Sequence, residues 1–386
     1  MAISDQLTLL NNTKTAIRTA INNKGGSVTD STPFADYSTA IDNLPSGGGD
    51  SQLIDLIEGD ITTLNIPSGT TMIGNYSISN KPNLTSVTIP NSVTSIGNGA
   101  FQQCPSLTSV NIPNSVTSIG NSAFSFCSSL TSVTIPNSVT SIEGSLFYNC
   151  TSLTSVTKPS SVTIIKTAAF FYCSNLKSLT IPSTVTQIGD SNWGNGVFSG
   201  CGNLTALICL PTTPPTAMNL SLEYSTNYVY VPAESVDAYK AASGWSTYAS
   251  RIYPITQVAT VDGNPVYNYE IGNKDSKTIM STEMDKLPTG TSIEFAEGIT
   301  NIAAGEINYQ QVTLPSTFTG FGDSDMIGSS VSTITSNAVT PPSAFKNRLG
   351  GSGLTAVYVP ASAVDTYKEN ATWSSFSSII QAIPTE

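Results

Sequence analysis

The chain lacks histidine entirely and is poor in charged residues. Only 11% of its 386 residues are charged, and 26 acidic against 15 basic residues give a net charge of −11. Without histidine, nucleophile–His pairs cannot form, and the commonest general base and metal ligand is missing. The acidic balance argues against nucleic-acid binding, which requires clustered Lys and Arg. The composition therefore predicts neither a triad hydrolase nor a nucleic-acid-binding protein.

Long hydrophobic runs are missing as well. No apolar stretch approaches the roughly 20 residues of a membrane-spanning helix, so we expect no membrane insertion. The start, Met1 to Gln6, has no basic segment followed by an apolar one, which predicts no secretory signal. No G-x-S-x-G elbow or G-x-x-x-x-G-K-[ST] loop occurs. We therefore expect no enzyme and no cofactor.

Carboxylates in the last third of the chain leave one catalytic alternative open. A glycosidase-type pair is conceivable between residues 262 and 325, although ordinary surface positions are the favoured interpretation. A Ca²⁺ site at residues 323–325 lacks the remaining spacing of a calcium loop, so no metal site is expected. The carboxylates in question are Asp262, Glu270, Glu294, Glu297 and Glu306.

A repeat dominates what is present. Four consecutive segments of 23 residues begin at Leu84, Leu107, Leu130 and Leu153. Each reads close to L-T-S-V-T-I-P-N-S-V-T-S-I-G, then a small residue, Phe, two variable positions and Cys. Self-similarity at this period indicates a solenoid, whose coils bury their apolar residues only by stacking on one another.

The apolar residues of one coil predict how it folds. Alternation after Leu84 predicts a short strand that ends at Pro90, since proline cannot donate to a ladder. A second short extended piece carries Ile96, and the chain then returns Phe101 and Cys104 to the core. Each coil thus offers too few inward residues to fold alone.

Four of the six cysteines recur once per coil, at Cys104, Cys127, Cys150 and Cys173. In one register of a solenoid they would stack about 4.8 Å apart with parallel side-chain directions, an arrangement that suits a disulfide poorly. Zinc sites require closer spacing such as C-x2-C, which is absent. We predict a buried ladder of free cysteines.

The array extends beyond the four regular copies. Residues 61–83 keep the register, and residues 176–203 form a 28-residue copy with an insertion around residues 190–196. The recurring I-P-x-S-V-T-S-I-G-x-x-A-F-x-x-C closely resembles the BspA-like class of bacterial leucine-rich repeats over about residues 61–210. That class occurs on adhesins and other surface proteins of bacteria and on proteins encoded by phages. The resemblance implies adhesion or protein interaction.

A longer-range repeat relates two distant segments. V-Y-V-P-A at 229–233 recurs at 357–361, and the similarity continues to Trp245 and Trp373. We expect each unit to form a strand, a short helix and a turn anchored by the tryptophan, and such units resemble those that close BspA-like arrays. The tryptophans are expected in the core, with an aromatic ligand site as the alternative. Residues 291–334 between the units predict a degenerate second solenoid.

The N-terminus predicts two short helices ahead of a glycine joint. Thr32-Pro33 starts the second helix, and Gly47 to Gly49 form the flexible joint. This segment resembles a helical segment common in phage tail and virion proteins, which implies attachment to other virion proteins. The first helix is an attachment or oligomerisation element, with an apolar stripe at heptad-like spacing formed by Ile3, Leu7, Leu10, Ile17 and Ile21.

The predicted fold is a mostly β solenoid of BspA-like leucine-rich repeats with a short α-helical N-terminal segment and small α/β capping units. The expected division is 1–46 helical attachment, 47–60 Gly-rich linker, 61–210 regular solenoid, 211–256 first cap, 257–338 degenerate second solenoid and 339–386 second cap.

The leading functional hypothesis is a phage virion structural protein of a tail or tail fibre. It would contact other virion proteins through the N-terminal helices and a host-surface glycan or protein through the repeats, as a homo-oligomer. The alternative is a bacterial cell-surface adhesin or interaction protein.

Candidate binding residues lie on the array, which is either a binder or a spacer. Trp193, in the Gly/Asn-rich insertion, either contacts a ligand or packs over the end of the stack. The other candidates are outward hydroxyls that form rows: Thr85, Ser86, Thr88, Thr108, Ser109, Thr131 and Ser132.

Overall fold

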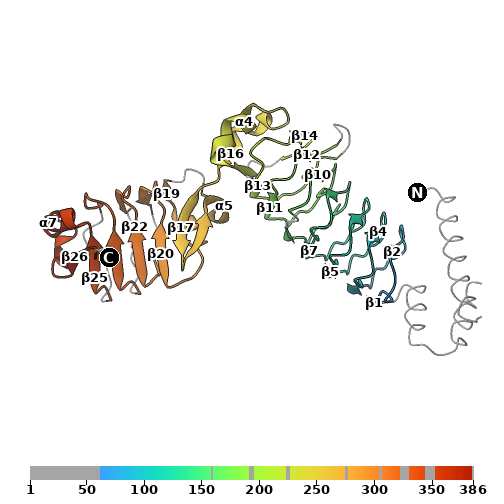
Figure 1. Ribbon diagram of the computed structural model, residues 1–386, viewed down its shortest axis with the longest axis horizontal. Coiled ribbons are helices and arrows are strands. Elements are labelled where there is room, and N and C mark those ends of the chain that lie inside the picture. The colour runs from blue at the N-terminus through green and yellow to red at the C-terminus, as the bar shows by residue number, and fades with distance from the viewer. Residues whose placement is uncertain are drawn as a thin grey trace, which may run out of the picture. The chain divides into compact units, whose positions relative to one another are not determined.

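The computed structural model describes residues 61–384 apart from 158–159, 191–194, 223–226, 274–276, 304–306, 322–329 and 344–352. The predicted helical segment 1–46 and the lead-in 47–60 lie outside the described residues. The described chain consists mainly of short parallel strands in stacked sheets (Figure 1). This confirms the predicted solenoid of leucine-rich repeats. No helix in the described part is both long and apolar enough to span a bilayer.

Two compact units make up the chain. One runs to Lys177 and also takes in Thr184–Leu204 and Pro215–Tyr224. The other comprises Ser178–Ser183, Thr205–Pro214 and Ser225–Glu386.

The longer strands of the first unit follow the 23-residue period. Thr63 pairs with Ser86, and Ser86 with Ser109, each in parallel register. Most of these strands alternate exposed, buried, exposed, so their central residue enters the core. The sheet contains β1 (Thr63–Asn65), β3 (Ser86–Thr88), β5 (Ser109–Asn111), β7 (Ser132–Thr134) and β9 (Ser155–Thr157).

Two-residue strands form the other wall of the same coils. One sheet contains β2 (Met72–Ile73), β4 (Ser95–Ile96) and β6 (Ser118–Ile119). A second contains β8 (Ser141–Ile142), β10 (Ile164–Ile165), β12 (Gln187–Ile188) and β14 (Thr216–Ala217).

The core of the first unit repeats once per coil. Successive buried phenylalanine rings lie with centroids 5.4, 6.0, 5.6 and 5.9 Å apart and nearly parallel planes. The rings belong to Phe101, Phe124, Phe147, Phe170 and Phe198.

The predicted cysteine ladder is confirmed beside these rings. The cysteines are buried, and the thiol of Cys127 donates to the carbonyl oxygen of Phe101 at 3.2 Å. Burial raises the pKa of the Cys104 thiol to about 11.

The second unit begins with a four-stranded parallel sheet of β11 (Ser178–Ile181), β13 (Ala206–Cys209), β15 (Tyr228–Val231) and β16 (Ile252–Pro254). Ser178 pairs with Ala206, 28 residues away. The five extra residues of this coil therefore leave the strand register intact.

The first capping segment follows β15, as predicted. A 3₁₀ turn (Ala233–Ser235), helix α4 (Val236–Ala241) and a second 3₁₀ segment (Ser246–Arg251) lead into β16. Trp245 is fully buried, and Tyr239 donates its hydroxyl to the carbonyl of Pro211 at 2.9 Å. These aromatic side chains are core anchors.

The degenerate array keeps its coils but varies their length. Ser292 pairs with Gln311, and Gln311 with Thr333, so successive coils differ in span. The seven-stranded sheet contains β17 (Gln257–Val261), β18 (Asn264–Tyr267), β20 (Ser292–Phe295), β22 (Gln311–Leu314), β24 (Thr333–Ser336), β25 (Ala356–Val359) and β26 (Ile380–Ala382). A three-stranded sheet contains β19 (Thr278–Ile279), β21 (Asn301–Ile302) and β23 (Gly320–Phe321).

An antiparallel hairpin, β17–β18, begins this sheet and was not predicted. Asp262 and Gly263 connect its strands with φ of 47° and 81°. Two central residues with positive φ make the tight turn that suits the twist of a hairpin. Two short helices follow, α5 (Asn268–Ile271) and α6 (Ser281–Met284).

The second capping segment repeats the first. It contains a 3₁₀ turn (Ala361–Ala363), α7 (Val364–Glu369) and a 3₁₀ turn (Ser374–Phe376). Trp373 is fully buried and donates its indole N–H to Pro342 at 2.9 Å.

Candidate binding surface

The predicted hydroxyl rows lie on the outside of the first array. All seven candidate Thr and Ser side chains outside the insertion are exposed. Strand register places Ser86, Ser109 and Ser132 side by side across β3, β5 and β7. We call the outward residues of these strands the outer strand face; they are Ser86, Thr88, Ser109, Asn111, Ser132 and Thr134.

The threonines that precede these strands have a structural task. Thr85 donates its hydroxyl to the carbonyl of Thr62 at 2.8 Å, Thr108 donates to Thr85 at 3.2 Å, and Thr131 donates to Thr108 at 3.3 Å. These hydroxyl protons join one coil to the next. The hydroxyl protons of Thr85, Thr108 and Thr131 are therefore used within the array.

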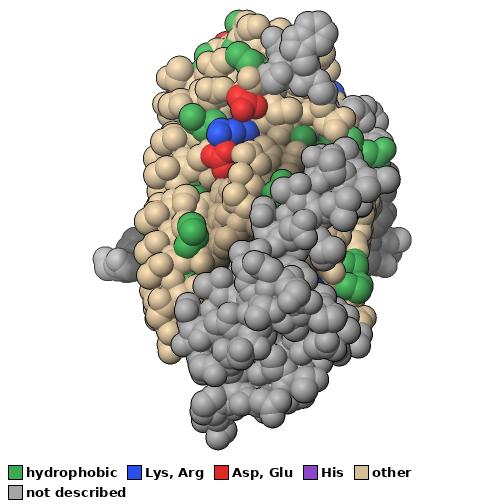
Figure 2. Space-filling view, turned by 90° about the vertical axis from the view of Figure 1, so that its right-hand side faces the viewer, with side chains coloured by type: hydrophobic (Ala, Val, Ile, Leu, Met, Phe, Trp, Pro, Cys, Tyr) green, Lys and Arg blue, Asp and Glu red, His purple; other side chains and the backbone are tan. Residues whose placement is uncertain are grey.

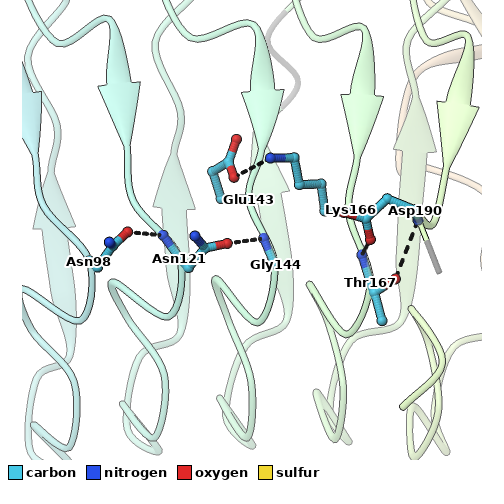
Figure 3. Close-up of polar contacts among 7 residues, drawn as sticks. All are labelled: Asn98, Asn121, Glu143, Gly144, Lys166, Thr167 and Asp190. Atoms are coloured by element: carbon cyan, nitrogen blue, oxygen red, sulfur yellow. Dashed lines mark hydrogen bonds and ion pairs between the residues drawn. The ribbon is translucent and has the colours of Figure 1, made fainter. Parts of the chain in front are cut away.

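An asparagine ladder runs along the side of the short strands (Figure 3). The Asn75 side-chain oxygen accepts from the amide of Asn98 at 2.7 Å, and Asn98 accepts from Asn121 at 2.8 Å. Asn121 then accepts from Gly144 at 3.1 Å. Each carboxamide thus satisfies a backbone donor that the coil itself leaves unpaired.

The ladder stops at Gly144, which has no side chain to continue it. Between this coil and the next one, Lys166 Nζ lies 2.6 Å from Glu143 Oε2. One coil further, Asp190 accepts from the Thr167 amide at 3.1 Å, and hydrogen bonds from Thr167 hold the pKa of the Asp190 carboxyl below its usual range. An ion pair and a carboxylate therefore join the coils where asparagine is missing.

The ion pair between Glu143 and Lys166 lies on a largely uncharged surface. Glu143 is the only charged residue from Leu84 to Ser152. The described part of the face shown in Figure 2 is mostly uncharged and carries a small group of charged side chains. An open groove of about 450 Å³ lies between the short strands, lined in part by Ser118, Thr140 and Ser141. The groove offers hydrogen-bonding groups without a nucleophile–base pair.

Three of the five carboxylates considered for catalysis accept hydrogen bonds from backbone amides. Asp262 accepts from the amides of Thr291 and Ser292, and Glu297 accepts from the amide and hydroxyl of Ser316. These hydrogen bonds lower the pKa of both carboxyls. Glu270 accepts from its own helix N-terminus at Tyr267. Each of these three side chains therefore has a structural role, because it satisfies backbone N–H groups.

The remaining candidates differ in their outcome. Trp193 lies outside the described residues, as do Glu306 and the five apolar residues of the N-terminal stripe. The matched tryptophans of the capping segments are core residues. The asparagine ladder was missed, although the Gly-Asn that recurs after β2, β4 and β6 was visible in the sequence.

Stacked parallel strands, one short coil per repeat and a once-per-coil phenylalanine define a leucine-rich repeat protein. The family model described as "BspA type Leucine rich repeat region" matches in six copies over residues 58–177 and 94–214. Residues 58–214 thus match repeats of the BspA type.

Several solved leucine-rich repeat structures are similar to this chain, with low TM-scores. The leucine-rich repeat protein TpLRR of T. pallidum is 31% identical over 38% of this chain and 65% of its own length, with a TM-score of 0.34. A leucine-rich cell surface protein of Faecalibacterium prausnitzii is 22% identical, covering 84% of this chain and 88% of its own, with a TM-score of 0.32. A leucine-rich repeat protein of Bacteroides ovatus is 21% identical, covering 84% of both chains, with a TM-score of 0.32. Among curated proteins none matches the chain.

Proposed function

We propose that the protein is a non-enzymatic binding protein of the bacterial cell surface, of the adhesin or interaction type. The observation that carries this proposal is the outer strand face, on which register aligns the same small hydroxyl side chains from coil to coil. Such a face offers many equivalent donors and acceptors to one extended partner. The BspA type of the repeats supports the same function.

Repetition supplies the binding mechanism. A contact to one serine is weak, but adjacent coils hold their copies in fixed positions, so the partner engages several at once without ordering the protein. Several copies of the chain on one surface would raise avidity further, by about 10²–10⁴ where geometry lets them engage together. The partner is a glycan or protein on a host surface.

The virion hypothesis is the weaker one. It depends on the resemblance of residues 1–46 to virion segments, which lie outside the described residues. The comparisons give it no support, whereas the repeat type fits the cell-surface alternative. Attachment through the N-terminal helices and homo-oligomer formation remain predictions.

The test replaces the serine row while preserving the core. The full chain carrying Ser86→Lys, Ser109→Lys and Ser132→Lys is compared with one carrying Thr at the same positions, for binding to immobilised host cells and extracellular matrix. Lysine is chosen because it reduces the negative charge of the chain, so loss of binding cannot reflect repulsion from an anionic surface.

We expect the lysine variant to lose binding and the threonine variant, which keeps the hydroxyls, to retain it. Repulsion between the adjacent lysines lowers the urea midpoint of the lysine variant, so its far-UV circular dichroism spectrum in the binding buffer must match that of the wild type. Equal binding by the lysine variant would remove the outer strand face from the mechanism. A wild-type chain that binds none of these surfaces would make the array a spacer and contradict the proposed function.

A further inference from the structure

Every coil of the first array contains one residue with a left-handed backbone directly before the cysteine position. The conformation serves the stack, because the amide of Phe126 donates to Tyr148 at 2.7 Å and that of Tyr172 donates to Ser199 at 2.8 Å, both in the next coil. The residues are Asn80, Gln103, Phe126, Asn149, Tyr172 and Gly200, with φ between 56° and 76°.

Two of these residues are poorly suited to the conformation. Glycine and asparagine adopt positive φ readily, whereas bulky side chains do so rarely. Phe126 and Tyr172 nevertheless occupy it, and they are 38% and 51% exposed. Since other coils fold with Asn or Gly there, the fold does not require an aromatic ring at either position.

The two exposed rings are joined by a row of ring contacts that passes through the buried Phe171. Ring centroids lie 5.3 Å apart from Phe126 to Tyr148, 4.7 Å from Tyr148 to Phe171 and 4.7 Å from Phe171 to Tyr172. We call these four residues the aromatic row. A Cβ on Gly200 would lie only 2.9 to 3.1 Å from the Tyr172 ring. The ring therefore lies against the backbone of Gly200 and the edge of Phe171, and about half of the Tyr172 side chain remains exposed.

The segments that carry the aromatic row are uncharged. The segments 122–127, 145–150, 168–173 and 198–201 contain no charged residue. Hydroxyls and amides flank the rings, including Ser145 and the half-buried Asn149. A charged partner would find no complementary group in these segments, whereas a neutral, hydroxyl-rich partner would.

We propose that the aromatic row binds a neutral glycan chain, with sugar rings placed on Phe126 and Tyr172. These two residues are two coils apart, which is about 10 Å along the array and similar to the length of a disaccharide unit. The apolar faces of the sugars would contact the rings, and their hydroxyls would reach the flanking amides and hydroxyls. The inference rests on the proposed binding function and names its ligand class.

A proline-rich peptide is the alternative occupant, and the geometry disfavours it. Such peptides dock into aromatic-lined grooves. Here the rings contact one another from Phe126 to Tyr172, so the space between the exposed rings is filled by Tyr148 and Phe171. Because no groove separates them, the two exposed rings, Phe126 and Tyr172, suit individual sugar rings better than a docked peptide.

The test uses the full chain on an array of neutral glycans, charged glycans and proline-rich peptides, followed by titration calorimetry with the best ligand. Phe126→Asn and Tyr172→Asn introduce the residue that the chain itself has at the equivalent positions 80 and 149. Gln103→Asn is the matched control, at the same backbone position in a coil without an exposed ring.

We expect a neutral glycan to bind the wild-type chain. Each aromatic substitution should weaken it about tenfold, and the double variant should lose it. Gln103→Asn should bind like the wild type. The urea midpoints of the asparagine variants should not fall, because asparagine tolerates the left-handed backbone.

Four results would overturn the proposal. The double variant could bind the glycan as the wild type does, or its urea midpoint could fall, which would make the rings structural. A proline-rich peptide could take the place of the glycan as the ligand lost in the double variant. Finally, the wild type could bind no neutral glycan while host-surface binding remains sensitive to lysines on the outer strand face. That last result would leave the proposed function intact.

Discussion

Gly120 lies where the asparagine ladder leaves no room for a side chain. A Cβ there would meet the amide nitrogen and the side-chain oxygen of Asn98, each at 2.5 Å. That oxygen accepts the hydrogen bond from Asn121, so a methyl group must displace this contact. Overpacking costs about 1–3 kcal/mol and a lost hydrogen bond about 1 kcal/mol, while the stiffer unfolded chain returns about 0.4–1 kcal/mol. We therefore expect Gly120→Ala to lower the free energy of unfolding by about 1–3 kcal/mol.

Gly144→Ala is the matched control on the same side of the array. A Cβ on Gly144 would lie 3.1 Å from the Asn121 side-chain oxygen and 3.5 Å from the Thr167 carbonyl. Small movements relieve these contacts, so we expect a change below about 1 kcal/mol. Urea denaturation of both full-length variants, followed by far-UV circular dichroism, measures the difference. Equal midpoints, or a Gly120→Ala variant as stable as the wild type, would refute the ladder geometry.

Three further predictions follow from the packing and the charges. Phe124→Ala removes a fully buried ring stacked between two others and should lower the free energy of unfolding by about 3–5 kcal/mol; Phe124→Leu should cost clearly less in the same urea titration. Glu143→Gln breaks the ion pair with Lys166, but both side chains are partly exposed, so thermal melts should show a loss of at most about 1 kcal/mol that shrinks in high salt. Backbone amides lower the pKa of Asp262 and Glu297, so the stability they contribute is complete above the unfolded values near pH 4 and is lost as pH falls through the lower folded values. A urea midpoint that falls as steeply in acid for Asp262→Asn as for the wild type would contradict that assignment.

The solenoid could be predicted because the repeats within the chain can be aligned with one another. Leu84, Ile96, Phe101 and Cys104 recur at one period, and identical coils can bury identical residues only by stacking in register. The structure places all four in the core. Stacking also explains why the cysteines form a ladder, since residues one period apart must lie one strand spacing apart.

Features that depend on the backbone φ of single residues could not be predicted from the repeat pattern. Phe126 and Tyr172 fall at positions that vary between copies, and only the left-handed backbone shows why Asn or Gly would suit them. The hairpin at Asp262 and Gly263 did carry a turn signal, but its apolar alternation also fits a solenoid strand. For Trp193, ligand contact and packing over the end of the stack both remain untested, because its position lies outside the described residues.

Display at the bacterial surface is the central claim, and labelling of intact cells tests it most directly. Antibodies raised against the full chain should label intact cells that produce the protein, and brief protease treatment of those cells should remove the signal. Label confined to purified phage particles, with none on intact cells, would contradict the cell-surface function and favour the virion hypothesis.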